Sequence, residues 1–261
     1  MKQEPVDIKT QIAKLNLLDH KEIDWERIER SAYLIHQHFR YDYPGPVHNL
    51  KQRLLIVPPD IYGDQRYIVH HLDVSADVVE TSSHSDEFGN RVIELLIPSI
   101  EQSVDFEAWI IVERSADKGP LVLPRAVLSD PHYLESSTLT QPDEVLREVA
   151  ATLAVVDQRP SDLARCINDW VYRTFRYAHD VTDIHTTASQ ALGLRQGVCQ
   201  DYAHVMLALC RLCGLPARYV SGHLLGEGST HAWVEVLVPA PEQPDQAITL
   251  ALDPTHNCET D

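Results

Sequence analysis

The sequence predicts a two-domain α+β protein, in which an antiparallel β-sandwich precedes a domain with a central helix packed on an antiparallel sheet. Short apolar segments separated by turn residues fill residues 31–115, as in sandwiches of short strands. Residues 199–212 are apolar on most faces of a helix, which indicates a buried central helix. Near the end of the chain, residues 231–238 and 247–253 alternate in the manner of strands.

The composition is typical of a globular protein with a sizeable core, since 44% of the 261 residues are hydrophobic. Lys and Arg number 22 against 39 Asp and Glu, which gives a formal net charge of -17. This charge argues against nucleic acid and anionic membranes as partners, because both need a basic protein surface. No segment reaches the roughly 20 apolar residues of a membrane span. With five scattered cysteines and no apolar signal at the N-terminus, a reduced, cytoplasmic protein is expected.

Changes in pattern divide the chain into four parts. These are a helical N-terminal extension at 1–30, a β-sandwich domain at 31–115, a transition at 116–141 and the helix-and-sheet domain at 142–261. The extension is predicted from helical spacing of apolar residues between Ile8 and Leu18. Within the sandwich, Phe88-Gly89-Asn90 has the composition of a hairpin turn. Lys118-Gly119-Pro120 interrupts regular structure and marks the transition.

The second domain is organised around a cysteine that follows a glycine turn. Gly197 makes the turn, Cys199 begins the helix, and Gly214 with Pro216 beyond it ends the helix. Unpaired N–H groups and the helix dipole stabilise a thiolate at such a position. Around this segment the sequence predicts helices at 143–156 and 161–177, a helical turn ending near Gly193, and strands at 217–225, 231–238 and 247–253.

Alternation in the last two strands brings a histidine and a carboxylate together. His231 opens one strand, Asp253 closes the next, and both lie on the less apolar face. In an antiparallel hairpin these two ends adjoin, so the side chains can be cross-strand neighbours. A carboxylate orients an imidazole, which in turn accepts a proton from a thiol. The predicted catalytic residues are Cys199 as nucleophile, His231 as base and acid, and Asp253 as orienting group, with His256 as a rival base.

Residues 187–257 resemble the core domain of the transglutaminase-like superfamily, which has a papain-like arrangement. The resemblance is carried by four blocks in order, Gly197–His204, Gly214–Gly222, His231–Glu235 and Asp253–Asn257. The N-terminal half resembles the β-rich domain that precedes this core in bacterial members, through Phe39–Pro44 and Phe88–Val92. The resemblance implies the same catalytic triad and an acyl-thioester intermediate. It also implies an oxyanion held by backbone N–H groups at the start of the cysteine helix and by one further donor, for which Gln196 is a candidate.

The expected activity is hydrolysis of an amide or peptide bond in a peptide or protein substrate, as in a cysteine protease or amidase. Amine transfer of the transglutaminase type is the alternative, and a non-catalytic peptide-binding module is a second one. The triad mechanism requires no cofactor and no metal, and the sequence leaves the oligomeric state open. The Pro-rich segment 239–245 departs from the family pattern and is expected to cover or restrict the site. The chain ends eight residues after Asp253, where relatives usually continue, so a final strand is expected to be missing or the chain to be shortened.

Other motifs in the second domain favour structural roles. Cys210-x-x-Cys213 has redox or metal spacing but lies in the apolar stripe of the helix, which predicts core packing. His204 is expected to be a structural hydrogen-bonding residue. Asp201 suits the first turn of the helix, where it is expected to point away from the thiol. Trp233 is predicted either to line a substrate groove or to pack in the domain.

In the N-terminal half, His36-x-His38 and His70-His71 are weak metal candidates. His36 and His38 share one strand face, but no carboxylate cluster joins them in the sequence pattern.

Overall fold

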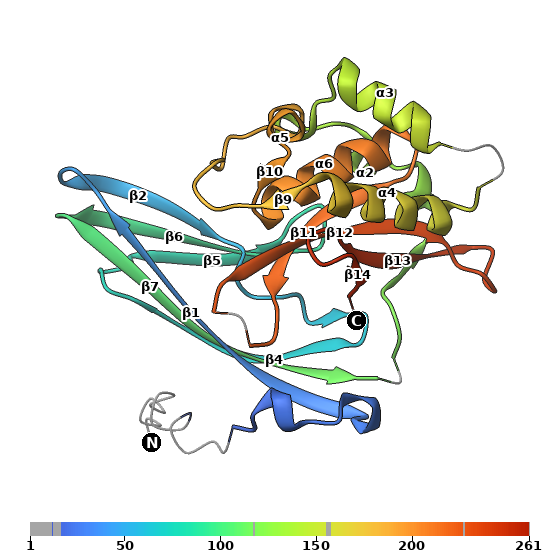
Figure 1. Cartoon of the computed structure of the whole chain (residues 1–261). Helices are drawn as coiled ribbons and strands as arrows, with labels where there is room; N and C mark the ends of the chain where they lie inside the picture. Colours follow the sequence, from blue (N-terminus) through green and yellow to red (C-terminus); the bar gives the residue numbers. More distant parts are fainter. Residues whose placement is uncertain (1–11, 13–16, 117, 155–157, 227, 261) are drawn as a thin grey trace. The chain divides into compact units, whose positions relative to one another are not determined.

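The computed structural model describes residues 12, 17–116, 118–154, 158–226 and 228–260. The chain divides into two compact units, Met1–Gly119 and Pro120–Asp261, each shown in Figure 1. The helix predicted between Ile8 and Leu18 lies largely outside the described residues. Beyond it, Asp19 caps the short 3-10 turn η1 (His20–Glu22), and η2 (Trp25–Arg27) follows, so two separate turns form here.

Unit 1 consists of two antiparallel sheets that share one hydrophobic core. One sheet has the order β1 (Arg30–Asp42), β7 (Ser103–Ser115), β4 (Gln65–Val74) and β3 (Ile61–Tyr62). The other has the order β2 (Val47–Leu54), β6 (Arg91–Ile100) and β5 (Glu80–Ser85). Alternate residues of β6 and β7 supply most of the core between them, including Ile93, Leu95, Ile97, Val104, Phe106 and Ile110. This arrangement confirms the predicted antiparallel sandwich.

The turn between β5 and β6 shows how local sequence sets the register of these strands. Gly89 has a φ of 80°, which suits glycine. The Asp86 side chain accepts hydrogen bonds from the backbone N–H groups of Phe88 (3.0 Å) and Asn90 (2.8 Å). The predicted turn at residues 88–90 is therefore confirmed.

Unit 2 is built around α6 (Cys199–Leu212), which lies between a sheet and a layer of helices (Figure 1). The sheet has the order β11 (Ala217–His223), β12 (Thr230–Pro239), β13 (Gln246–Asp253) and β14 (Cys258–Glu259), and β8 (Val122–Pro124) also pairs with β13. The covering helices are α3 (Glu144–Leu153), α4 (Pro160–Thr174) and α5 (Ala188–Leu194). The remaining elements are η3 (Arg125–Ser129), α2 (Pro131–Leu134), η4 (Thr138–Thr140), β9 (Arg176–Tyr177) and β10 (Gln196–Gly197).

Burial explains why α6 is apolar on nearly every side. All residues from Asp201 to Cys210 are buried, and Met206 and Leu209 are fully enclosed. Cys210 is part of the core and Cys213 packs against it, as expected for the CxxC spacing. Burial raises the pKa of both thiols, so neither is a reactive group. Within the described residues, every helix is too short or too polar to span a bilayer.

The Pro-rich segment does not lie where it was expected. It joins β12 to β13, and Arg125 holds it by donating to the Pro244 carbonyl (3.0 Å). His231 is at the start of β12 and Pro239 at its end, so the two are about 26 Å apart along an extended strand. The expectation that residues 239–245 cover the site is therefore wrong, because the hairpin loop closes the opposite end of the two strands.

Candidate active site

The nucleophile position is set by a tight turn before α6. Val198 is the extended N-cap residue and Cys199 is the first residue of the helix. A Cβ atom at Gly197 would lie 2.3 Å from the Asp201 side-chain oxygen, so only glycine fits there. That Asp201 oxygen accepts hydrogen bonds from the Val198 backbone N–H (2.8 Å) and the Thr182 hydroxyl (2.7 Å). Asp201 therefore caps the helix and faces the preceding turn, which leaves the helix start available to the thiol.

The thiol of Cys199 is half-buried and hydrogen-bonded. Burial by itself raises a thiol pKa, because it disfavours the charged form. Hydrogen bonds with the His231 side chain and with the backbone of Ala232 and Gln200, together with the charge of His231, outweigh burial and lower the pKa of Cys199. This thiol is therefore closer to the reactive thiolate than an ordinary cysteine.

His231 connects the thiol to the carboxylate. Its Nε2 lies 2.8 Å from Oδ2 of Asp253, and both side chains are buried. Burial lowers the pKa of His231, but hydrogen bonds with Asp253 and Cys199 outweigh it and raise the pKa to about 10. Because Asp253 occupies Nε2, Nδ1 is the nitrogen left for Cys199. The arrangement favours an imidazolium beside a thiolate, with the negative charge of Asp253 behind it.

The strand register explains how these side chains meet. Val234 pairs with Leu252 in the β12–β13 ladder, so Asp253 stands opposite Trp233 and diagonal to His231. Side chains in such diagonal positions share a face and can still touch when they are long. The structure thus brings Cys199, His231 and Asp253 together in the order that the sequence predicted. Their catalytic roles remain a prediction.

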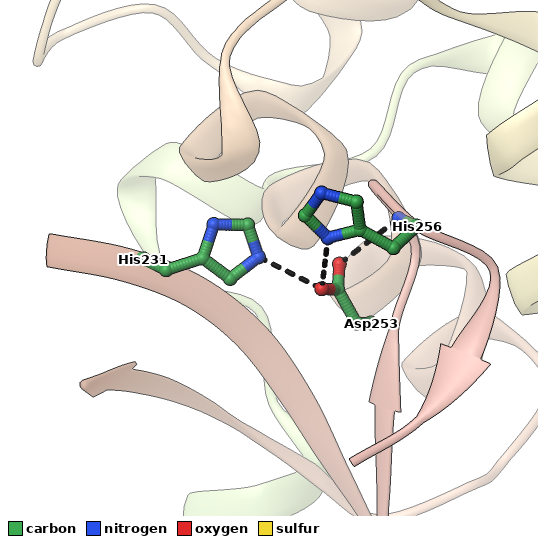
Figure 2. Close-up of side chains that lie close together, drawn as sticks. All are labelled: His231, Asp253 and His256. Atoms are coloured by element: carbon green, nitrogen blue, oxygen red, sulfur yellow. Dashed lines mark hydrogen bonds and ion pairs between the residues drawn. The ribbon is translucent and has the colours of Figure 1, made fainter. Parts of the chain in front are cut away.

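His256 lies against the carboxylate. Its Nδ1 is 2.7 Å from Oδ2 of Asp253, the oxygen that His231 also contacts (Figure 2). The other oxygen, Oδ1, accepts from the backbone N–H groups of Thr255 (2.8 Å) and His256 (3.3 Å). Burial raises the pKa of Asp253, but the bonds from both histidines outweigh it and lower the pKa. The hydrogen bond that acts on Cys199 comes from His231, so the geometry favours His231 over its rival as the base.

Three residues beside the site were not singled out from the sequence. Tyr219 of β11 has a pKa raised to about 12 by burial and by the nearby Cys199 and Asp201. Gly222 faces Trp233, since a Cβ there would lie 2.3 Å from the indole. The third is Thr182, which anchors Asp201 as described above. Tyr219 and Gly222 fall in the block Gly214–Gly222 of the family resemblance, but only contacts between elements give them a role.

Three other side chains singled out from the sequence are those of Trp233, His204 and Gln196, and the structure shows what each one contacts. Trp233 packs over Gly222, and its ring lies 6.4 Å from that of His231 at 23°. His204 is buried with its ring 5.5 Å from that of Tyr219, and the backbone of Thr186 is a hydrogen-bond partner, whereas its Nδ1 has none among the described residues. The side-chain oxygen of Gln196 accepts a hydrogen bond from Arg176 (2.9 Å), so its amide nitrogen is the atom left to donate. Its role as an oxyanion donor stays a prediction.

In unit 1, three of the four candidate histidines each pair with one carboxylate, and the described residues there form no cluster of three ligands, as the sequence pattern predicted. His36 pairs with Glu107 (2.9 Å), His38 with Asp105 (2.8 Å) and His71 with Asp73 (2.8 Å). The spacing of residues along the chain did not predict these pairs. The carboxylates beside His36 and His38 come from the neighbouring strand β7, and Asp73 lies two residues after His71 on the same face of β4. They remain separate pairs. In the described ranges, the group that gathers three ligand atoms within 4.8 Å is His231, Asp253 and His256.

Comparisons with known proteins agree with this architecture. Residues 147–246 match the transglutaminase-like superfamily, and residues 33–113 match the bacterial transglutaminase-like N-terminal region. An uncharacterized protein of Mycobacterium tuberculosis is 29% identical over 219 residues, which cover 74% of this chain and 69% of that protein. An uncharacterized protein of Mycobacterium leprae is 34% identical over 114 residues, which cover 36% of this chain and 41% of that protein.

A crystal structure of a candidate cysteine protease from Cytophaga hutchinsonii shares the fold. The TM-score is 0.66 at 21% identity, and the alignment covers 87% of this chain and 78% of the other. The match to the superfamily contains Cys199 and His231 and ends before Asp253. From these matches and the two units described above, the chain is a member of the transglutaminase-like superfamily in which a bacterial transglutaminase-like N-terminal region precedes the core.

Proposed function

We propose that this protein is a thiol-dependent hydrolase of amide or peptide bonds that works through an acyl-thioester on Cys199. The observation that supports this most directly is the hydrogen-bonded series from Cys199 through His231 to Asp253 at the start of α6. A lowered thiol pKa beside a raised imidazole pKa is the electrostatic arrangement that thiol acyl transfer needs. A binding module would need none of these three residues.

The proposed reaction follows from the positions of these groups. The Cys199 thiolate attacks the substrate carbonyl, and backbone N–H groups at the start of α6 stabilise the oxyanion. His231 gives its Nδ1 proton to the leaving amine, so the C–N bond breaks and the acyl-thioester remains. His231 then accepts a proton from water, which attacks the thioester, so the C–S bond breaks, the acid is released and the Cys199 thiolate is restored beside the His231 imidazolium. Asp253 keeps the imidazole oriented and stabilises its charged form throughout.

Amine transfer is the second candidate, because the core belongs to the transglutaminase-like superfamily. In that reaction a primary amine takes the place of water and forms a new amide. The two reactions share every step up to the acyl-enzyme, and they differ in which nucleophile reaches it.

The test is a product analysis on the full chain. A glutamine-containing peptide is incubated with and without a primary amine, and Cys199→Ala serves as the control without a nucleophile. We expect deamidated or cleaved peptide to form even in the presence of the amine, and no product from the variant. Exclusive formation of the amine adduct would show that transfer is the activity. Product formation by the Cys199→Ala variant would exclude the proposed nucleophile.

A further inference from the structure

Asp253 lies between two imidazoles that approach the same oxygen. His231 Nε2 is 2.8 Å and His256 Nδ1 is 2.7 Å from Oδ2 (Figure 2). The two rings are 5.2 Å apart between centroids. The proposed reaction uses His231 and Asp253 and gives His256 no task, so the convergence of the three groups calls for another explanation.

The three groups form a ligand set typical of zinc. Two imidazole nitrogens and one carboxylate oxygen, completed by water, occur at tetrahedral zinc sites with metal–ligand distances of about 2.0–2.2 Å. Ligand atoms of such a site are about 3.3–3.5 Å apart, so each nitrogen–oxygen distance needs to open by about 0.5–0.8 Å. All three ligand atoms already lie within 4.8 Å of one another. Rotation of the half-exposed His256 can open its own distance to the carboxylate, whereas the distance between the buried His231 and Asp253 has to widen through small movements of those two side chains.

The surroundings also suit a metal ion. The Asp253 carboxylate is fixed through its second oxygen by two backbone N–H groups, from Thr255 and His256. Such outer contacts orient a ligand and strengthen metal binding. The His256 side chain is 47% exposed, whereas that of Asp253 is 1% exposed, so an ion can enter from the His256 side and meet a buried carboxylate.

We propose that zinc, or a similar divalent transition-metal ion, binds to His231 Nε2, Asp253 Oδ2 and His256 Nδ1 and inhibits the enzyme. The inhibitory consequence rests on the proposed function, while the binding site itself does not. Binding releases the Nε2 proton of the His231 imidazolium to solvent, and the metal takes the lone pair that is freed. His256 carries its own proton on Nε2 in this state. The His231 ring then keeps one proton, on Nδ1, and cannot pass it to a leaving amine without becoming an imidazolate.

The binding test is calorimetric titration of the full chain with zinc chloride. We expect His256→Ala to weaken the affinity at least about tenfold, since even outer contacts of metal ligands are worth that much. His256→Gln provides a second variant of similar size, and thermal unfolding of both checks that they fold. His38→Ala is the matched control, because His38 is also half-exposed and hydrogen-bonded to an aspartate (2.8 Å). Cys199→Ser should bind zinc as the unmodified chain does.

The outcomes separate the metal site from the activity. Equal zinc affinity in the unmodified chain and both folded His256 variants overturns the proposal. Loss of binding in Cys199→Ser alone would place the ion on the thiol and also overturns it. Because calorimetry needs no substrate, failure to find a turned-over peptide would count only against the proposed function. Where turnover is found, inhibition by zinc should require at least about tenfold more metal in the His256 variants.

Discussion

At the scale of single residues, the reactivity of Cys199 depends on one imidazole. Burial alone would make this thiol less acidic than usual, and the hydrogen bond with His231 is the largest effect in the opposite direction. His231 in turn depends on Asp253, whose hydrogen bond is the largest effect that raises the pKa of the imidazole. The three groups therefore respond together when any one of them is changed.

Alkylation of Cys199 should reveal this dependence. At pH 6.5 a thiol of ordinary pKa, about 8.5, is only about 1% thiolate. We expect iodoacetamide to label Cys199 well at this pH, and His231→Ala to slow the labelling by at least about tenfold. Labelled peptides quantified by mass spectrometry give the rates, and the exposed Cys166 of the same molecules is the internal control. Equal labelling rates for Cys199 and the buried Cys210 would contradict an activated thiol.

The pH dependence of kcat/KM should show how strongly Asp253 raises the pKa of His231. His231 has its pKa raised to about 10, so it should remain able to donate a proton until the pH approaches that value. In Asp253→Asn the charge is lost, and the alkaline limb of kcat/KM should move down toward pH 6.5. We also expect kcat to fall at least about 100-fold, as when the orienting carboxylate of other triads is neutralised. An unchanged alkaline limb would show that Asp253 does not set the pKa of His231.

The same shift predicts how stability depends on pH. The folded-state pKa of His231 lies above the unfolded value of about 6.5, so its contribution is fully present below pH 6.5. That contribution is lost as the pH rises toward about 10. We expect the melting temperature of the unmodified chain to fall over this range, and to fall less in His231→Gln. Parallel curves for the two chains would argue against a raised pKa of His231.

At the scale of elements, the turn before α6 holds the helix start in place. Gly197 leaves just enough room for the Asp201 carboxylate, which binds both the Val198 N–H and the Thr182 hydroxyl. One side chain thus joins the turn, the helix and the segment that precedes α5. The position of the thiol therefore depends on this local packing as well as on β12, the strand that carries His231 and packs against α6.

Gly197→Ala tests this turn. Its Cβ would lie 2.3 Å from the Asp201 oxygen, so the cap must break or move. We expect a loss of about 1–3 kcal/mol in the free energy of unfolding, measured by urea denaturation, together with slower alkylation of Cys199. Gly193→Ala in α5 is the matched control, because nothing lies within 4 Å of its Cβ position. That control should be neutral or slightly stabilising; equal stability of both variants would contradict the packing argument.

At the scale of the whole molecule, each unit has its own hydrophobic core. The core of unit 2 lies around α6, while that of unit 1 lies between its two sheets. The described residues of the candidate site, from Cys199 to His256, all belong to unit 2. Strand β8 lies at the start of unit 2 and pairs with β13, the strand that carries Asp253.

A fragment of residues 120–261 should therefore fold without unit 1. We expect a cooperative thermal transition and a pH dependence of Cys199 alkylation like that of the full chain. A fragment that starts at residue 126 lacks β8 and should be less stable, because β13 loses one of its neighbours. A fragment 120–261 without a cooperative transition would show that the core of unit 2 needs unit 1.

Local patterns in the sequence predicted the architecture and the positions of the candidate site residues on their helix and strands. The glycine turn, the apolar helix and the alternation of two strands are set by neighbours along the chain, because helices and strands have fixed periods. The same periods, together with the ends of the two strands, predicted that His231 and Asp253 meet, while the chemistry of thiol catalysis and the family resemblance added Cys199.

Contacts between distant elements could be decided only by the tertiary structure. Local spacing does not specify which side chains reach across strands, so the His36–Glu107 and His38–Asp105 pairs did not appear in the sequence pattern. The same limit applies to His256, whose ring folds back onto Asp253 beyond the end of its strand. The position of the segment 239–245, by contrast, follows from the strand directions that the sequence already predicted, since a loop that joins the two strands lies at the end opposite His231 and Asp253. The sequence by itself identified the candidate nucleophile Cys199 and its expected partners His231 and Asp253. The tertiary structure decided which other side chains lie around these three, because such contacts depend on how separate helices and strands pack.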